Sequence, residues 1–280
     1  METTRTRSSL ERADVQLSYE LAGQGPPILF IQGVGVTGEG WRPQVRGLQD
    51  RFQTLTFDNR GIGRSQPCRG PISIEAMAED AHALLDAAGW ESAHLVGHSM
   101  GGVIAQQLAL DCPKRVRSLS LLCTFARGKD AARLTPWVLW ITLRTRLGSR
   151  RMRRRAFLEM LMPPDDLPGV ELDELAAQVG LLVGRDLADQ PPILMKQLRA
   201  LGRHDALNRL PELRDIPTLV LSAESDRIAL PQYGRTLAAA IPGARYEQIT
   251  AASHGVIFQK AGQINQMLAQ FFESLGARSH

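Results

Sequence analysis

The sequence predicts an α/β fold, with a mostly parallel sheet, helices on both of its faces and one helical insertion. Short apolar runs alternate with amphipathic segments along most of the chain. Such runs are typical of buried parallel strands, and their alternation with helices is typical of βαβ units. The alternation stops over residues 129–210 and resumes after Pro211. We therefore expect a core domain built from residues 1–128 and 211–280, and a helical cap or lid built from residues 129–210.

The expected strands and helices follow from the period of the apolar residues. Residues 15–21 alternate with a period of two, and the helix over residues 74–85 can be capped by Ser73. The expected strands are 15–21, 28–31, 54–57, 93–96, 116–123, 218–222 and 244–249, and the clearest helices are 74–85, 100–110 and 264–275.

Composition and charge exclude several classes of protein. The 280 residues are 44% hydrophobic and 22% charged, as in ordinary globular proteins, and the net charge of +4 is too small to indicate nucleic acid as a partner. Three cysteines without a C-x-x-C pair indicate neither a disulfide framework nor a zinc site. No apolar segment follows the polar stretch from Met1 to Leu10, so we expect a cytoplasmic protein without stable membrane insertion. Homodimer formation is left open.

The central motif is Gly97-His98-Ser99-Met100-Gly101, between an expected strand and an expected helix. A nucleophilic serine at a sharp strand-to-helix turn needs small neighbours, because the backbone passes close on both sides. The start of the helix also places backbone N–H groups where an oxyanion would form. We therefore interpret Ser99 as a nucleophile, although an ordinary glycine-rich helix entry can have the same pattern.

A serine nucleophile needs a base, and the base needs an acid that orients it. His254 follows the last expected strand and should lie at the same edge of the sheet as Ser99. Asp226 follows the strand over 218–222, with Glu224 as its rival. We predict His254 as the base and Asp226 as the acid. The remaining histidines are expected to have other roles: His82, His94, His98, His204 and His280.

The order of these three residues resembles that of the α/β-hydrolase family. So do the turn Gly33-Val34-Gly35 and the segment Asp58 to Ser65. The resemblance implies that the N–H groups of Val34 and Met100 form an oxyanion hole, that residues 58–65 support the oxyanion loop, and that the insertion acts as a cap. Gln32 stands where the family commonly has histidine.

One alternative is a dinucleotide-binding oxidoreductase. Residues 33–38 fit G-x-G-x-x-G after a strand, and Asp58 stands near the position of a ribose-binding acid. However, Gly40 and Pro43 interrupt the helix that should begin at the third glycine. This hypothesis also leaves Ser99, Asp226 and His254 unexplained.

The expected cap is rich in apolar and basic side chains. Trp137, Trp140, Phe157 and Met160 are the candidates for enclosing a small or medium apolar substrate, although some of them could simply pack the cap onto the sheet. The arginines of residues 144–155 could contact an anionic membrane or nucleic acid, but a solvated helix face is the simpler interpretation.

The predicted activity is hydrolysis of a carboxylic ester or lactone through an acyl-enzyme at Ser99, with no cofactor and no metal. The resemblance equally admits carbon–carbon bond hydrolases and cofactor-free perhydrolases. A small-molecule receptor that keeps the three residues but turns over slowly is the alternative from a different class.

Overall fold

The computed structural model describes residues 5–131, 135–167 and 169–276. His280 therefore lies outside the described residues. The chain folds around an eight-stranded sheet in the order β1-β2-β4-β3-β5-β6-β7-β8. β1 pairs antiparallel with β2, and β2 pairs antiparallel with β4, whereas all the other pairs are parallel. The strands are Thr6–Glu11, Gln16–Ala22, Pro27–Ile31, Gln53–Phe57, Ala93–His98, Val116–Leu122, Thr218–Ala223 and Arg245–Ile249 for β1 to β8.

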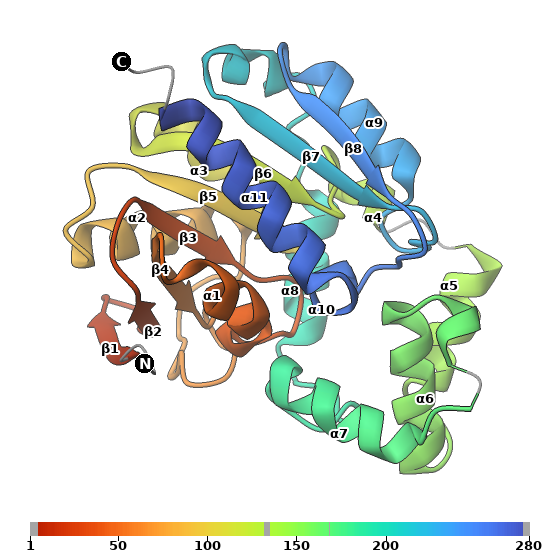
Figure 1. The fold of residues 1–280 in the computed structure, drawn as a ribbon. Helices are drawn as coiled ribbons and strands as arrows, with labels where there is room; N and C mark the ends of the chain where they lie inside the picture. Colours follow the sequence, from red (N-terminus) through yellow and green to blue (C-terminus); the bar gives the residue numbers. More distant parts are fainter. Residues whose placement is uncertain (1–4, 132–134, 168, 277–280) are drawn as a thin grey trace.

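Helices cover both faces of this sheet. In Figure 1, α11 (Ala261–Gly276) and α1 (Arg42–Leu48) lie in front of the strands, and α2 (Ile74–Ala87) and α3 (Met100–Asp111) lie behind them. α9 (Pro231–Ala240) packs on β7 and β8, and the short α10 (Val256–Gln259) precedes α11. The predicted α/β class is therefore confirmed.

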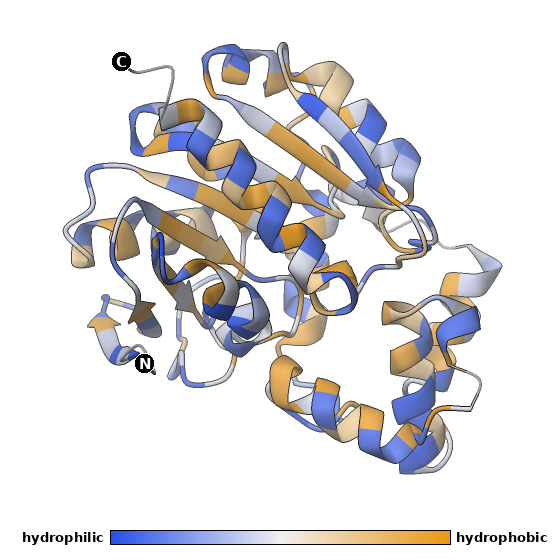
Figure 2. Ribbon diagram, viewed as in Figure 1, coloured by the Kyte–Doolittle hydropathy of each residue, from blue (hydrophilic) through white to orange (hydrophobic). Residues whose placement is uncertain are grey.

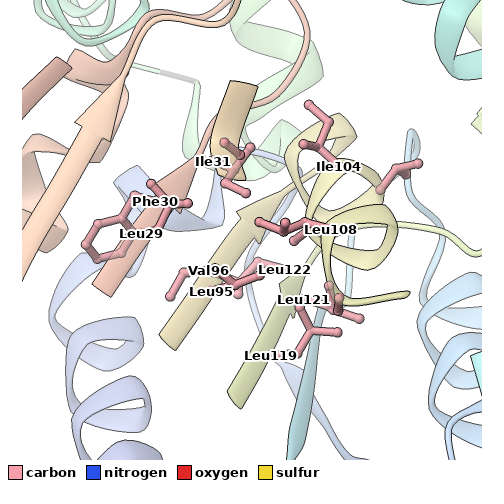
Figure 3. Close-up of a cluster of buried hydrophobic side chains, with 14 of the residues drawn as sticks. Leu29, Phe30, Ile31, Leu95, Val96, Ile104, Leu108, Leu119, Leu121 and Leu122 are labelled. Carbon is pink, nitrogen blue, oxygen red and sulfur yellow. The ribbon is translucent and has the colours of Figure 1, made fainter. Parts of the chain in front are cut away.

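The core lies between the central strands and these helices. Figure 3 shows side chains of β3, β5, β6 and α3 packed together, among them Leu29, Val96, Ile104 and Leu121, and all four are fully buried. The central strands are coloured hydrophobic along most of their length in Figure 2, as expected for strands buried on both faces. This rigid layer fixes the loops at the carboxyl ends of the strands.

The inserted segment between β6 and β7 contains helices, turns and an isolated antiparallel bridge between Arg127 and Asp205, and no strand among its described residues. The helices are α4 (Gly128–Ala131), α5 (Pro136–Arg144), α6 (Arg150–Leu161), α7 (Leu172–Val183) and α8 (Leu194–Arg203). Leu158, Val179 and Leu187 form part of a small apolar cluster that is separate from the main core. Figure 1 shows α5, α6 and α7 beyond the tips of the strand arrows.

The arginines of residues 144–155 mostly form ion pairs. Arg150 and Arg154 both bind Asp186, at 2.8 and 3.0 Å, and Arg144 and Arg155 both bind Glu159. This segment is therefore an ion-paired helix surface. None of the helices within the described residues is long and apolar enough to span a membrane.

Three elements differ from the sequence-based expectation. β1 was not predicted, because its polar sequence TRSSLE forms an exposed edge strand. α9 is not among the helices expected above; it begins at Pro231, whose missing N–H costs nothing at the first helical position. Pro43 likewise lies in the first turn of α1, so the helix begins after Gly40.

Candidate active site

Ser99 lies at the sharp turn between β5 and α3. Its backbone has φ 55° and ψ −122°, a conformation that L-residues rarely adopt. A Cβ atom on Gly97 would lie 2.3 Å from the carbonyl oxygen of Gly101, and one on Gly101 would lie 2.0 Å from that of Ile31. The glycines of the motif are thus required by close backbone contacts. The turn is held because the Ser99 N–H donates to the Leu122 carbonyl at 3.0 Å.

Three side chains form one chain of hydrogen bonds at this turn. Ser99 Oγ lies 3.1 Å from His254 Nε2, and His254 Nδ1 lies 2.8 Å from Asp226 Oδ2. A carboxylate can only accept, so Nδ1 carries the proton and Nε2 is free to accept one from the serine hydroxyl. All three residues are buried. The structure therefore brings together the nucleophile, base and acid that the sequence predicts.

The two carboxylates near the end of β7 make different contacts. Asp226 Oδ1 accepts hydrogen bonds from the N–H groups of Ile228 and Ala229, each at 2.8 Å, so its other oxygen is directed at His254. Glu224 is exposed, and its Oε2 accepts from the Ala251 N–H at 3.1 Å. Asp226 thus contacts the imidazole, while Glu224 braces the loop before it.

The other described histidines make structural contacts. His98 Nε2 donates to the His254 carbonyl at 2.8 Å, and burial lowers the pKa of His98 to about 3, so its ring is neutral. His94 lies 2.8 Å from Ser118 Oγ and stacks on Phe272. His82 contacts Arg115, and His204 lies near Glu75. His98 therefore supports the loop that carries His254.

The loop that follows β3 lies against Ser99. A Cβ atom on Gly33 would lie 3.1 Å from Ser99 Cβ, so the loop touches the nucleophile. Val34 follows Gly33, and Met100 is the first residue of α3. The Gly33 N–H donates to Gln32 Oε1 at 2.9 Å, so the glutamine side chain folds back on its own loop. Val34 thus lies in the loop that touches Ser99 and lines the same cavity, and Met100 directly follows Ser99 in the chain.

Helices of the insertion hold this same loop. The Gly35 N–H donates to Oε1 of the buried Gln197 on α8, at 2.8 Å. The Arg185 guanidinium donates to the Gly35 carbonyl, and the Thr37 N–H donates to the Val183 carbonyl at 3.3 Å. Sequence analysis did not find Gln197 or Arg185, because nothing in their local pattern connects them to a loop 150 or more residues away.

The glycine loop lacks the geometry of a dinucleotide site. The Gly38 N–H donates to Asp58 Oδ1 at 2.8 Å, and the Gly35 N–H is used by Gln197. A 3₁₀ turn over Gly38–Trp41 replaces the helix that would receive a pyrophosphate. Asp58 also accepts from the Arg64 N–H at 2.9 Å, so it braces the two loops together. The described residues contain no group of three side chains suited to hold a metal ion.

Ser99 and His254 open into an apolar cavity between the sheet and the insertion. The cavity measures about 1120 Å³ including its open mouth, and Phe157 and Met160 form part of its wall. Trp137 lines an adjoining cavity that shares Met160 and several other wall residues. Trp140 does not line either cavity: it is 52% exposed, with Arg144 stacked on its ring. The reason is helical spacing, since α5 buries Ile141 and turns the preceding residue outward.

Comparison with known proteins agrees with the fold. A family model described as "alpha/beta hydrolase fold" matches residues 26–261. A putative carbamate hydrolase, RutD of Azorhizobium caulinodans, is 34% identical over 263 residues, covering 92% of this chain and 95% of the relative. The putative non-heme bromoperoxidase BpoC of Mycobacterium tuberculosis superposes with a TM-score of 0.80 at 28% identity, covering 92% of this chain and 96% of the other. The enol-lactonase of Burkholderia xenovorans superposes with a TM-score of 0.77 at 28% identity, covering 92% and 97%.

The chain therefore belongs to the alpha/beta hydrolase fold family, and the resemblance seen in the sequence is confirmed. The names of its relatives give different activities. Membership of the family therefore establishes the fold, and the reaction has to be inferred from the residues of the site.

Proposed function

We propose that this protein is a serine hydrolase that cleaves a carboxylic ester or lactone of a small or medium apolar substrate. The observation that carries the proposal is the continuous chain of hydrogen bonds from Asp226 through His254 to Ser99, at the wall of an apolar cavity. A serine hydroxyl becomes an effective nucleophile when a correctly oriented base can take its proton.

In the first half-reaction, Ser99 Oγ attacks the carbonyl carbon and its proton passes to His254 Nε2. The tetrahedral intermediate carries a negative oxygen, which the N–H groups of Val34 and Met100 stabilise. The intermediate collapses as the bond to the alcohol oxygen breaks, and His254 returns the proton to that oxygen. An alcohol leaves, and an acyl-enzyme remains on Ser99.

In the second half-reaction, His254 takes a proton from water, which attacks the acyl carbon. The Ser99 Oγ leaves and recovers a proton from His254, so a carboxylic acid is released and the enzyme returns to its starting state. Asp226 holds the proton-bearing Nδ1 and stabilises the imidazolium formed in each half-reaction.

The cavity favours an apolar substrate. Its exposed lining is mostly carbon, contributed by side chains such as Val36, Phe157 and Leu198, and the adjoining cavity beside Trp137 offers room for a longer chain. The helical insertion supplies much of this wall, which is the role of a cap. The named activity of the enol-lactonase supports a lactone as the cyclic equivalent of the ester, and that of RutD makes a carbamate the second candidate substrate.

The test is a panel of uncharged esters of graded acyl length, with a lactone and a carbamate of matched size. Steady turnover of at least one ester, its loss in Ser99→Ala with an unchanged thermal unfolding profile, and unchanged rates in a chelator would support the proposal. Turnover in Ser99→Ala at the rate of the unmodified protein would refute it. A single turnover that then stops would favour the slow receptor, and turnover of the carbamate alone would favour the second candidate.

A further inference from the structure

Arg185 is the charged side chain that reaches the cavity from beside the oxyanion loop. It follows α7, lines the cavity that contains Ser99 and His254, and donates to the Gly35 carbonyl. Its Nε donates to the Asp189 carbonyl at 3.0 Å. Both of these acceptors are neutral backbone oxygens, so neither neutralises the guanidinium.

Carboxylates close to Arg185 in sequence are bound to other arginines. Asp186 binds Arg150 and Arg154, and Asp189 binds Arg150 at 3.1 Å. Among the described residues, no carboxylate lies within ion-pairing distance of Arg185. A partly buried cation without a paired anion is an unusual feature, because taking a charge out of water is costly unless something compensates for it.

The cost is visible in the acid–base behaviour of this side chain. Desolvation lowers the pKa of Arg185 to about 10, and the distant charge of Asp189 opposes that shift only in part. Arg185 thus lies in surroundings that weaken its hydration without supplying a counter-charge. A bound anion would replace the hydration that the Arg185 guanidinium has lost with an opposite charge.

The charges of the side chains that line the cavity favour an anion. Among the described residues that line it there is no aspartate and no glutamate, whereas Arg185 and the exposed Arg146 both contribute to its wall. Arg185 Nη2 has no hydrogen-bond partner among the described residues, and it lies 3.5 Å from where a Cβ atom on Gly35 would be. A donor is therefore free close to the loop that carries Val34.

We propose that Arg185 binds a carboxylate group of the substrate, so that the preferred substrates are apolar esters or lactones with a free carboxylate away from the scissile bond. This inference rests on the proposed function and specifies its substrate class. An arginine suits the task because its planar fork of donors matches the two oxygens of a carboxylate. The apolar wall would hold the carbon chain between the carboxylate and the reacting carbonyl.

The test compares matched pairs of substrates. Each pair consists of a 4-nitrophenyl ester of a linear acid whose far end carries either a carboxylate or the uncharged, nearly isosteric carboxamide, with spacers of several lengths. A second series places the same two groups on the alcohol side of the ester. The readout is the ratio of kcat/KM for the carboxylate to kcat/KM for the carboxamide, which cancels general damage to the site.

The unmodified protein should prefer the carboxylate by about 30-fold at the best spacer, as expected for a partly desolvated charge pair. Arg185→Gln should bring that ratio to about 1, and Arg185→Lys should keep part of it. Arg151→Gln removes the same charge from an exposed site outside the cavity and should leave the ratio unchanged.

Several results would overturn the inference. A ratio near 1 for the unmodified protein at every spacer, with normal turnover of the carboxamides, would refute the role of Arg185 and leave the proposed function standing. Equal losses on both members of each pair in Arg185→Gln would show that this side chain only holds Gly35. Absence of turnover for every ester, together with no reaction of Ser99 with a fluorophosphonate, would refute the proposed function itself.

Discussion

Replacement of Asp226 with asparagine exchanges one carboxylate oxygen for an NH₂ group and reverses one hydrogen bond. In the structure, Oδ1 accepts from two backbone N–H groups, and Oδ2 accepts from His254 Nδ1. An asparagine must keep its oxygen toward the two N–H donors, so its NH₂ group faces the imidazole. The imidazole then adopts the other tautomer, with the proton on Nε2 directed at Ser99 Oγ. A base in that state cannot take the serine proton.

The size of the effect follows from this reversal. We expect kcat to fall by about 10⁴-fold in Asp226→Asn, the loss that a change of tautomer causes in serine proteases. The matched control is Glu224→Gln, because Glu224 is exposed and its single contact with Ala251 can be kept by an amide oxygen. We expect it to change kcat by no more than about threefold. Circular dichroism and thermal unfolding of both variants check that the fold is kept.

The assay is steady-state hydrolysis of one uncharged ester at a pH where the unmodified protein is fully active. A larger loss in Glu224→Gln than in Asp226→Asn would show that the acid is misassigned. A loss of less than about tenfold in Asp226→Asn would show that orientation of the imidazole contributes little, and the argument from the tautomer would then be wrong.

Three further changes test other parts of the structure. Gln197→Leu removes the acceptor of the Gly35 N–H, and a buried N–H without a partner costs about 1 to 3 kcal/mol. The loop that carries Val34 should then lose its position, so that kcat falls about tenfold with KM nearly constant. An unaltered kcat would mean that the insertion does not position the loop. Arg60→Met removes the buried one of the two arginines that bind Asp80, the other being the half-buried Arg12, and urea denaturation should show a loss of about 3 kcal/mol in the free energy of unfolding; a loss below about 1 kcal/mol would contradict this. Burial lowers the pKa of His94 to about 4, so the unfolded chain binds the proton first as the pH falls below about 6.5, and stability is lost toward the folded pKa. Between pH 6.5 and 4.5 that loss is about 2 kcal/mol and should be absent in His94→Gln, as urea denaturation at both pH values can show; equal losses in the two proteins would exclude His94 as the cause.

Much of the sheet could be predicted because local patterns determine it. The strands β3, β4, β5, β6 and β7 are buried on both faces, and turns that contain glycine, asparagine or proline separate their apolar runs from the neighbouring segments. β1 could not be predicted in this way, since an edge strand with alternating exposed residues has no apolar signal. Its position depends on pairing with β2, which is a tertiary contact.

The residues of the candidate site likewise fall into those that the sequence predicts and those that only tertiary packing places. Ser99, Asp226 and His254 follow strands whose carboxyl ends meet at one edge, so their proximity follows from topology alone. Gln197 lies on α8 and Arg185 just after α7, and no local period in the sequence encodes how these segments pack against the glycine loop. Trp140 illustrates the converse error, because an aromatic residue beside a cavity-lining helix face can still turn to solvent.

Identification of the residue that becomes acylated tests directly whether Ser99 is the nucleophile. The protein is mixed with a slowly deacylating ester, quenched in acid, digested and analysed by mass spectrometry, with a fluorophosphonate-treated sample in parallel. If Ser99 is the nucleophile, the mass of the acyl group, and that of the phosphonyl group, appears on Ser99 and on no other residue, and both are lost in Ser99→Ala. A modified residue other than Ser99, or ester turnover by Ser99→Ala at the unmodified rate, would contradict it.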